Sequence, residues 1–190
     1  MRASTRDRVA TVISEIGGPS PLLLVGLLEV GLPTGAVLPT LISVFTMAVA
    51  PYGATIWLAR AGKVDGRFVA DRSQRMPILL ATLVVVIAGA VAVVLLQAPS
   101  SLVRLSVAAV AALMIVMVIT LRWKISIHAT IAAFFAGLQV ALFGPIGLIA
   151  MLIPLLVVWA RYRLRAHTAG QLIAGLALGA ALALSYALLG

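Results

Sequence analysis

Residues 77–96 read PILLATLVVVIAGAVAVVLL, twenty consecutive residues without a charged side chain. A helix that crosses a lipid bilayer needs about 20 mostly apolar residues, so this stretch predicts a transmembrane helix. The composition agrees, since 63% of the 190 residues are hydrophobic and 10% are charged. Soluble domains have about 45–50% apolar and about 25% charged residues. The chain is therefore too apolar to be a water-soluble domain, and we expect it to lie in a membrane.

Further apolar runs extend this pattern, and they cover residues 17–59, 105–121, 125–160 and 168–189. The first and third are long enough for two spans each, and glycine with proline at 31–35 and 143–147 marks where each would turn. None of the runs shows the period-two alternation of a membrane barrel. We therefore predict an all-α, polytopic transmembrane helix bundle of six or seven spans, seven if both long runs divide.

Residues 1–16 are expected to form an interfacial N-terminal segment ahead of a transmembrane domain at 17–190. Apolar side chains recur in this segment at helical spacing, at Val9, Val12, Ile13 and Ile16. Such a pattern is typical of a helix that lies along a membrane surface. The segment is unlike a signal peptide, because its apolar run begins late and no small-residue cleavage site follows.

The basic residues are distributed unevenly about the predicted spans. The chain has 14 Lys and Arg against 5 Asp and Glu. All the cations except Arg104 fall on one face, in four groups: Arg2, Arg6 and Arg8; Arg60, Lys63, Arg67, Arg72 and Arg75; Arg122 and Lys124; Arg161, Arg163 and Arg165. Cytoplasmic loops carry such an excess of Lys and Arg. We expect a multi-pass protein of the cell membrane with this basic face in the cytoplasm.

Both histidines of the chain lie on this basic face. Three polar segments lead into apolar runs there, at 71–77, 124–128 and 161–171. Arginine and helix N-termini both bind phosphate well, because they offer several N–H donors together with positive charge. A neutral imidazole can attack phosphorus while a second one protonates the leaving alkoxide. The pattern points to phosphoryl transfer, and His167 and Gln171 are spaced to hydrogen-bond on one helix face.

Other chemistries fit the sequence less well. The five carboxylates are not clustered near the histidines, so we expect neither a metal nor another cofactor. The chain has no cysteine, which excludes thiolate ligands and a cysteine nucleophile. Nucleic acid is not an expected partner, because these loops are too short to form an exposed basic and aromatic face. Phosphorylated or anionic lipids are the expected partners.

The polar segments resemble the motifs of the type-2 phosphatidic acid phosphatase superfamily. The third motif of that superfamily runs Ser-Arg-x5-His-x3-Asp, and this chain matches it with Arg161, His167 and, in place of Asp, Gln171. Ala160 stands where the motif has Ser. The chain looks most like a divergent bacterial branch that has Lys-Ile-Ser-x-His and His-Thr-x-x-Gln.

The other two motifs are matched more loosely. The second, Pro-Ser-Gly-His, is represented by Ser126 and His128, with isoleucines replacing Pro and Gly. The first, Lys-x6-Arg-Pro, is represented by Arg75, which precedes Pro77 by two residues, with Arg67 as the upstream cation. The resemblance covers about residues 60–190.

The resemblance implies a role for each matched residue. His167 is the implied nucleophile, which forms a phosphohistidine, and His128 is the implied acid that protonates the leaving group. Gln171 replaces the Asp that orients and activates the nucleophile in the superfamily, which needs no metal. The implied phosphate-binding residues are Arg161, Arg75, Ser126, Arg72 and Lys124.

The expected function is hydrolysis of a phosphate or diphosphate ester of a membrane lipid, such as an isoprenoid phosphate or diphosphate or phosphatidate. An alternative is a non-catalytic relative that binds or transports phosphorylated lipids, which Gln171 and the loose first motif favour. An unrelated small transporter is a third hypothesis. It is disfavoured because Glu29 is the only charge within a predicted span, where a carrier usually holds several polar residues.

Overall fold

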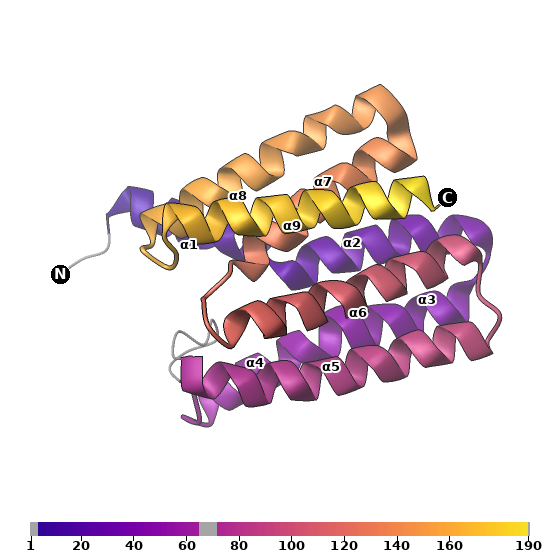
Figure 1. Ribbon diagram of the computed structural model, residues 1–190, viewed down its shortest axis with the longest axis horizontal. Helices are drawn as coiled ribbons and strands as arrows, with labels where there is room; N and C mark the ends of the chain where they lie inside the picture. Colours follow the sequence, from indigo (N-terminus) through magenta and orange to yellow (C-terminus); the bar gives the residue numbers. More distant parts are fainter. Residues whose placement is uncertain (1–3, 65–71, 190) are drawn as a thin grey trace. The chain divides into compact units, whose positions relative to one another are not determined.

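A computed structural model describes residues 4–64 and 72–189, with residues 72–75 described by their backbone alone. The described residues form helices and turns and contain no strand, which confirms the predicted all-α class (Figure 1). In chain order the helices are α1 (Thr5–Ile16), α2 (Pro19–Gly31), η1 (Leu32–Thr34), α3 (Val37–Val44), η2 (Phe45–Val49), α4 (Ala50–Arg60), α5 (Arg72–Leu95), α6 (Ser100–Thr120), α7 (Ile127–Phe143), η3 (Gly144–Met151), α8 (Leu152–Arg163) and α9 (Ala169–Leu188).

The chain divides into two compact units, with one boundary inside α2. The terminal unit combines Met1–Leu22 with Lys124–Gly190, and the central unit is Leu23–Trp123. Both histidines and most of the predicted site residues belong to the terminal unit. Arg72 and Arg75 belong to the central unit.

The central unit contains a long helix that changes its winding once. α3, η2 and α4 follow one another without a loop, and η2 is a single π-helical turn. Pro51, which follows this turn, lacks the N–H that an α-helix would donate to the carbonyl of Met47. The wider π turn accommodates the missing hydrogen bond. Thr46 in this turn packs so closely on α5 that a Cβ at Gly89 would collide with its hydroxyl.

The turns of the central unit fall where the sequence predicts them. The break at 31–35 is the short 3-10 helix η1, and it ends at Gly35 with a φ of 75°. That left-handed conformation favours glycine, because glycine has no Cβ to clash. α5 and α6 form a hairpin, and the turn at 96–99 separates them between the predicted runs 77–96 and 105–121.

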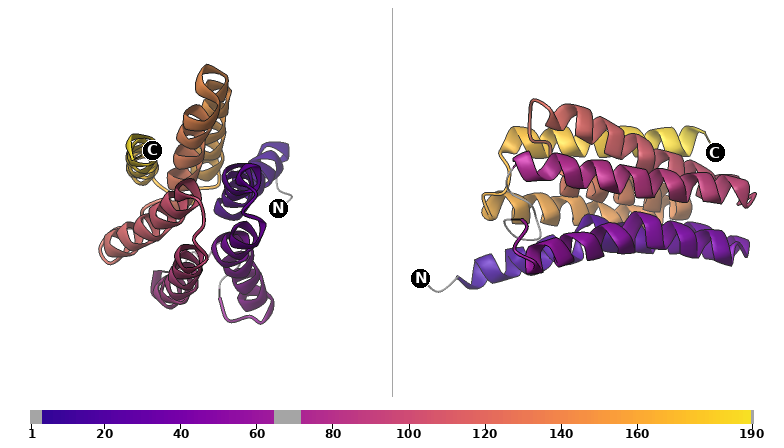
Figure 2. Two further views of the ribbon diagram at one scale, coloured as in Figure 1. Left: turned by 90° about the vertical axis from the view of Figure 1, so that its right-hand side faces the viewer. Right: turned by 90° about the horizontal axis from the view of Figure 1, so that it is seen from below.

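In the terminal unit, α7, η3 and α8 form a helical hairpin. α7 ends at Phe143, and Gly144 reverses the chain with a φ of 60°. η3 then packs back on α7 so tightly that a side chain at Gly147 would collide with the backbone of Gln139. Figures 1 and 2 show α7 and α8 as an antiparallel pair. The predicted division of 125–160 at 143–147 is therefore confirmed.

α9 packs against α7 with almost no space between the two backbones. A Cβ at Gly175 would lie 2.6 Å from the carbonyl oxygen of Ser126, and one at Gly179 would collide with the carbonyl oxygen of Thr130. Small residues on a helix face permit this close approach in membrane bundles. The contact ties the start of α7 to the first half of α9.

Six helical stretches are long and apolar enough to cross a membrane: Thr5–Thr34, Val37–Arg60, Met76–Leu95, Ser100–Thr120, Ile127–Arg163 and Ala169–Leu188. The stretch Ile127–Arg163 includes both arms of the α7–α8 hairpin, so the helices are consistent with seven crossings. Large apolar side chains point outward along them, as Leu80, Val84, Ile87 and Val91 do on α5. The chain is thus an all-α polytopic membrane protein.

Candidate functional site

The loop between α8 and α9 presents His167 at the start of α9. The backbone N–H of Ala166 donates to the carbonyl oxygen of Arg161 at 3.0 Å, which folds the loop onto the last turn of α8. Arg165 has a φ of 51°, a left-handed conformation that is uncommon outside glycine. His167 directly precedes Thr168, the N-cap of α9. The loop therefore holds the histidine beside the N–H groups of the first turn of α9.

The cap of α9 orients the imidazole of His167. Gln171 Oε1 accepts a hydrogen bond from the backbone N–H of Thr168 at 3.1 Å, and Thr168 Oγ1 accepts one from the N–H of Gln171 at 3.4 Å. This is a capping box, in which the two residues satisfy each other's backbone donors. Because a backbone N–H can only donate, the amide atom that faces it must be the oxygen.

The same amide oxygen determines the tautomer of His167. It lies 3.2 Å from Nδ1 of the imidazole, which is 8% exposed. Since an oxygen faces Nδ1, Nδ1 carries the proton, and the lone pair of the neutral ring is on Nε2. The predicted hydrogen bond between His167 and Gln171 is confirmed. Its predicted basis is wrong, because His167 precedes α9 and does not share a helix face with Gln171.

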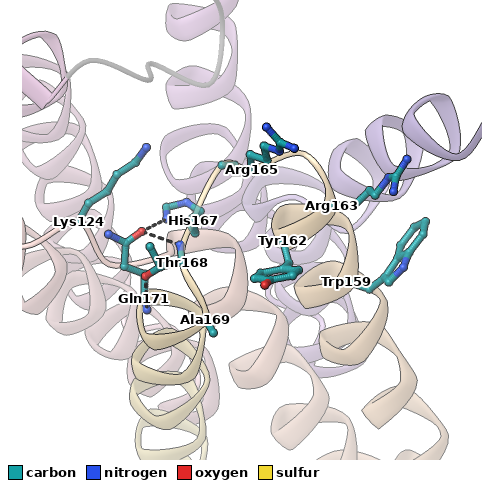
Figure 3. Close-up of a pocket in the computed structure, with 10 residues that line it drawn as sticks. Lys124, Trp159, Tyr162, Arg163, Arg165, His167, Thr168, Ala169 and Gln171 are labelled. Carbon is teal, nitrogen blue, oxygen red and sulfur yellow. Dashed lines mark hydrogen bonds between the residues drawn. The ribbon is translucent and has the colours of Figure 1, made fainter. Parts of the chain in front are cut away.

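An open pocket of about 900 Å³ surrounds this histidine (Figure 3). Figure 3 shows Lys124 beside His167 and Gln171, and the ring of Tyr162 between them and α8. The lining is basic and aromatic and contains no carboxylate: Lys124, Trp159, Tyr162, Arg163, Arg165, Ala166, His167, Thr168, Ala169 and Gln171. A lining with three cations suits an anion such as phosphate.

Arg161 does not line this pocket. Its side chain is 4% exposed, and Nη1 donates to Oγ of Ser14 on α1 at 2.9 Å. A second polar contact joins the same helices, because Nε of Arg163 lies 2.9 Å from a carboxylate oxygen of Asp7. The segment predicted at the membrane interface therefore packs against α8, within the terminal unit.

Ser126 and His128 open α7 and are also outside the pocket lining. Ser126 is fully buried as the N-cap, and its Oγ accepts from the N–H of Ala129 at 3.3 Å. Its own N–H donates to the carbonyl oxygen of Gln171 at 3.3 Å, which links the starts of α7 and α9. His128 faces the turn between α1 and α2, where a Cβ on Gly18 would lie 3.7 Å from its Nε2.

Of the predicted site residues, the pocket brings together His167, Gln171 and Lys124. Arg72 and Arg75 lie in the first turns of α5, and their side chains are outside the described residues. Their predicted role in phosphate binding therefore stays a prediction.

Several residues of the pocket were not selected from the sequence. Thr168 could have been found, because Thr-x-x-Gln before an apolar run is the signature of a capping box. Trp159 and Tyr162 could have been paired by their spacing of three residues, which puts them on one face of a helix. Arg163 and Arg165 belong to the basic face, but only the loop geometry shows that both line one pocket.

The described residues include no group of three His, Asp or Glu that could hold a metal ion. The candidate site is therefore defined by imidazole, amide, hydroxyl and cationic groups at one end of the terminal unit. Comparison of the chain with protein-family models, with curated proteins and with solved structures finds no match.

Proposed function

We propose that this protein is an integral membrane phosphatase, which hydrolyses a phosphate or diphosphate ester of a membrane lipid through a phosphohistidine at His167. The observation that carries the proposal is the orientation of one imidazole in a cationic pocket. Gln171 holds the proton on Nδ1, so Nε2 is the nucleophilic nitrogen. The resemblance to the type-2 phosphatidic acid phosphatase superfamily supports the same assignment.

The reaction has two steps. Nε2 of His167 attacks the terminal phosphorus, a P–N bond forms, and the P–O bond to the leaving group breaks. The leaving group is the lipid alkoxide of a monophosphate ester or the lipid monophosphate of a diphosphate ester, and it takes a proton from a general acid, the role that the resemblance gives to His128. Water then attacks the phosphohistidine and gives a proton back to the general acid. Orthophosphate is released and the neutral imidazole is regenerated. The Gln171 oxygen stabilises the positive ring of the intermediate by accepting from Nδ1–H.

The charge in the pocket supports binding of the phosphate group. Lys124, Arg163 and Arg165 line the pocket, and the lining itself contains no carboxylate, although Arg163 is also paired with Asp7 of α1. Ala169, the first residue of α9, also lines the pocket. The N-terminus of a helix carries unpaired N–H groups and the positive end of the helix dipole, which favour an anion.

The surroundings of the pocket favour a lipid ester over a soluble one. Trp159 and Tyr162 are both exposed at the end of α8. Aromatic residues are enriched at this depth, where headgroups meet hydrocarbon. An ester whose phosphate enters the pocket can then keep its apolar tail along the outward-facing side chains of the bundle.

Purified protein in detergent would be tested for phosphate release from a panel of lipid phosphates and diphosphates, with a metal chelator present. We expect turnover by the wild type under these conditions, because the proposed reaction uses no metal. His167→Ala should abolish turnover, since it removes the nucleophile. Ser185→Ala is a matched control, because its exposed hydroxyl bonds only within α9, to Ala181. It should behave as the wild type does.

The phosphoenzyme gives the same test a second readout. A phosphoramidate is acid-labile, so protein quenched during turnover should carry phosphate that acid releases, and His167→Ala should carry none. Normal turnover by His167→Ala contradicts the proposal. So does activity that the chelator removes and magnesium restores.

A second candidate function is binding or transport of phosphorylated lipids without hydrolysis. The specific observation in its favour is that neither His128 nor Arg161 lines the pocket around His167. Under this alternative, the wild type binds vesicles that contain a lipid phosphate but releases no phosphate from them. The His167→Ala variant would then bind such vesicles nearly as well.

A further inference from the structure

We infer that α1 supports the anion pocket from outside its lining, and that Ser14 is a positioning residue that holds Arg161 and, through it, the loop that presents His167. This inference rests on the proposed function for its turnover assay, whereas its binding test does not need hydrolysis. It assigns a role at the site to a segment that the sequence places only at the membrane surface.

Ser14 of α1 and Arg161 of α8 are in direct contact. The two residues are 147 positions apart in the chain, yet Oγ of Ser14 lies 2.9 Å from Nη1 of Arg161. Ser14 is fully buried and Arg161 is 4% exposed, so water does not replace this acceptor readily. A buried guanidinium needs its donors satisfied, because an unsatisfied one costs far more than a single hydrogen bond gains. Ser14 is therefore one of the groups that hold this side chain in place.

Arg161 is connected in turn to the loop that presents His167. The carbonyl oxygen of Arg161 accepts from the N–H of Ala166, the residue directly before His167. Between them Arg165 takes its left-handed conformation, which the surrounding contacts must maintain. A shift of Arg161 would therefore move the loop that places His167 and Arg165 in the pocket.

α1 also fits closely against α8. A Cβ at Gly17 would lie 2.5 Å from Val157 of α8. The absence of a side chain at Gly17 thus allows the end of α1 to pack closely against α8. At its other end, Asp7 binds Arg163, which lines the pocket and extends toward α1 in Figure 3. α1 is held at both ends next to the cations of the site.

The test measures binding of inorganic phosphate to the purified full-length protein by calorimetry. Ser14→Ala removes the acceptor with little change in volume, and we expect the dissociation constant to rise by about tenfold. KM for the lipid ester should rise by a similar factor. Thr11→Ala is the matched control: its hydroxyl also lies on α1, but it bonds to the backbone of Asp7 within the helix at 2.9 Å. This control should bind phosphate as the wild type does.

A double-mutant cycle separates positioning from general loss of structure. In an Arg161→Lys background, Ser14→Ala should change phosphate affinity by less than twofold, because the guanidinium that it positions is absent. Melting temperatures from tryptophan fluorescence show whether each variant is folded. A merely structural role of Ser14 would give the same change in affinity in both backgrounds, and that result would overturn the inference.

The remaining outcomes separate this inference from the proposed function. If Ser14→Ala binds phosphate as tightly as Thr11→Ala does, only the role of α1 is overturned. If the wild type binds phosphate but hydrolyses no lipid ester, and Ser14→Ala weakens that binding, the role of α1 stands and the phosphatase is overturned. A wild type that binds no phosphate and releases none from any lipid ester overturns both.

Discussion

The amide oxygen of Gln171 serves the helix and the histidine together. It accepts from the backbone N–H of Thr168 and from Nδ1 of His167, so the residue that completes the capping box of α9 also sets the imidazole tautomer. A carboxylate at this position would accept the same two bonds and add a negative charge. Gln171 therefore supplies an acceptor to both donors without the charge that a carboxylate would add.

Substitutions at Gln171 test this separation of geometry and charge. Gln171→Glu keeps the side-chain length, so we expect the cap to persist and turnover to stay equal or to rise, because a carboxylate stabilises the positive imidazole. Gln171→Asp should act in the same direction. The chain itself shows that Asp can complete such a cap, since Asp7 accepts from the N–H of Ser4 at 3.3 Å at the start of α1.

Gln171→Leu tests the loss of the amide oxygen. It removes the acceptor for both bonds, so we expect turnover to fall by tenfold or more and stability to fall by about 1 kcal/mol, the usual value of a helix cap. Phosphate release and thermal unfolding measure the two effects. Equal turnover by the Glu and Leu variants would show that Gln171 does not set the state of His167.

At the scale of elements, the contact between α7 and α9 determines how the two helix starts meet. Gly179→Ala would drive a methyl group into the carbonyl oxygen of Thr130, so we expect a loss of about 1–3 kcal/mol in stability. Gly53→Ala is the control, because nothing lies within 4 Å of a Cβ there and α4 gains a better helix former. Thermal unfolding in detergent compares the two variants.

Another glycine on this contact allows a compensating change. A Cβ at Gly137 of α7 would collide with the Cβ of Ala183 on α9, so Gly137→Ala should also destabilise the protein. Adding Ala183→Gly removes that methyl and should recover part of the loss. If the double variant is no more stable than Gly137→Ala, the two helices do not pack as the structure has them.

The elements themselves could be predicted because their ends have local causes. Gly35 and Gly144 reverse the chain with positive φ, and both fall inside the predicted breaks. The packing partner of α1 has no such local signal. Helical spacing of Val9, Val12 and Ile16 predicts an apolar face, and those side chains are indeed exposed, while Ser14 contacts Arg161 far along the chain. A hydrogen bond over that separation follows only from the tertiary fold.

At the scale of the whole molecule, the basic residues of each unit lie at the ends of its helices. In the terminal unit, Lys124 precedes α7, and Arg163 and Arg165 stand where α8 ends. In the central unit, Arg122 follows α6, whereas Arg104 lies near the opposite end of that helix. Each unit therefore has one strongly basic end, as the sequence predicts.

The final prediction is that the basic ends face the cytoplasm and that the two termini lie on opposite sides of the membrane. The predicted seven crossings, an odd number, would separate the termini, and positive residues are retained on the cytoplasmic side. Cations that bind substrate would lie at the site whichever way the protein is oriented in the membrane. Arg2, Arg6 and Arg8, however, precede the pocket residues in the chain, and their positive charge indicates the same orientation. Reporter fusions after Arg8, Gln97 and Gly190 should report cytoplasm, exterior and exterior. A fusion after Arg8 that reports the exterior, or one after Gly190 that reports the cytoplasm, contradicts the seven-crossing topology, whatever the activity of the pocket proves to be.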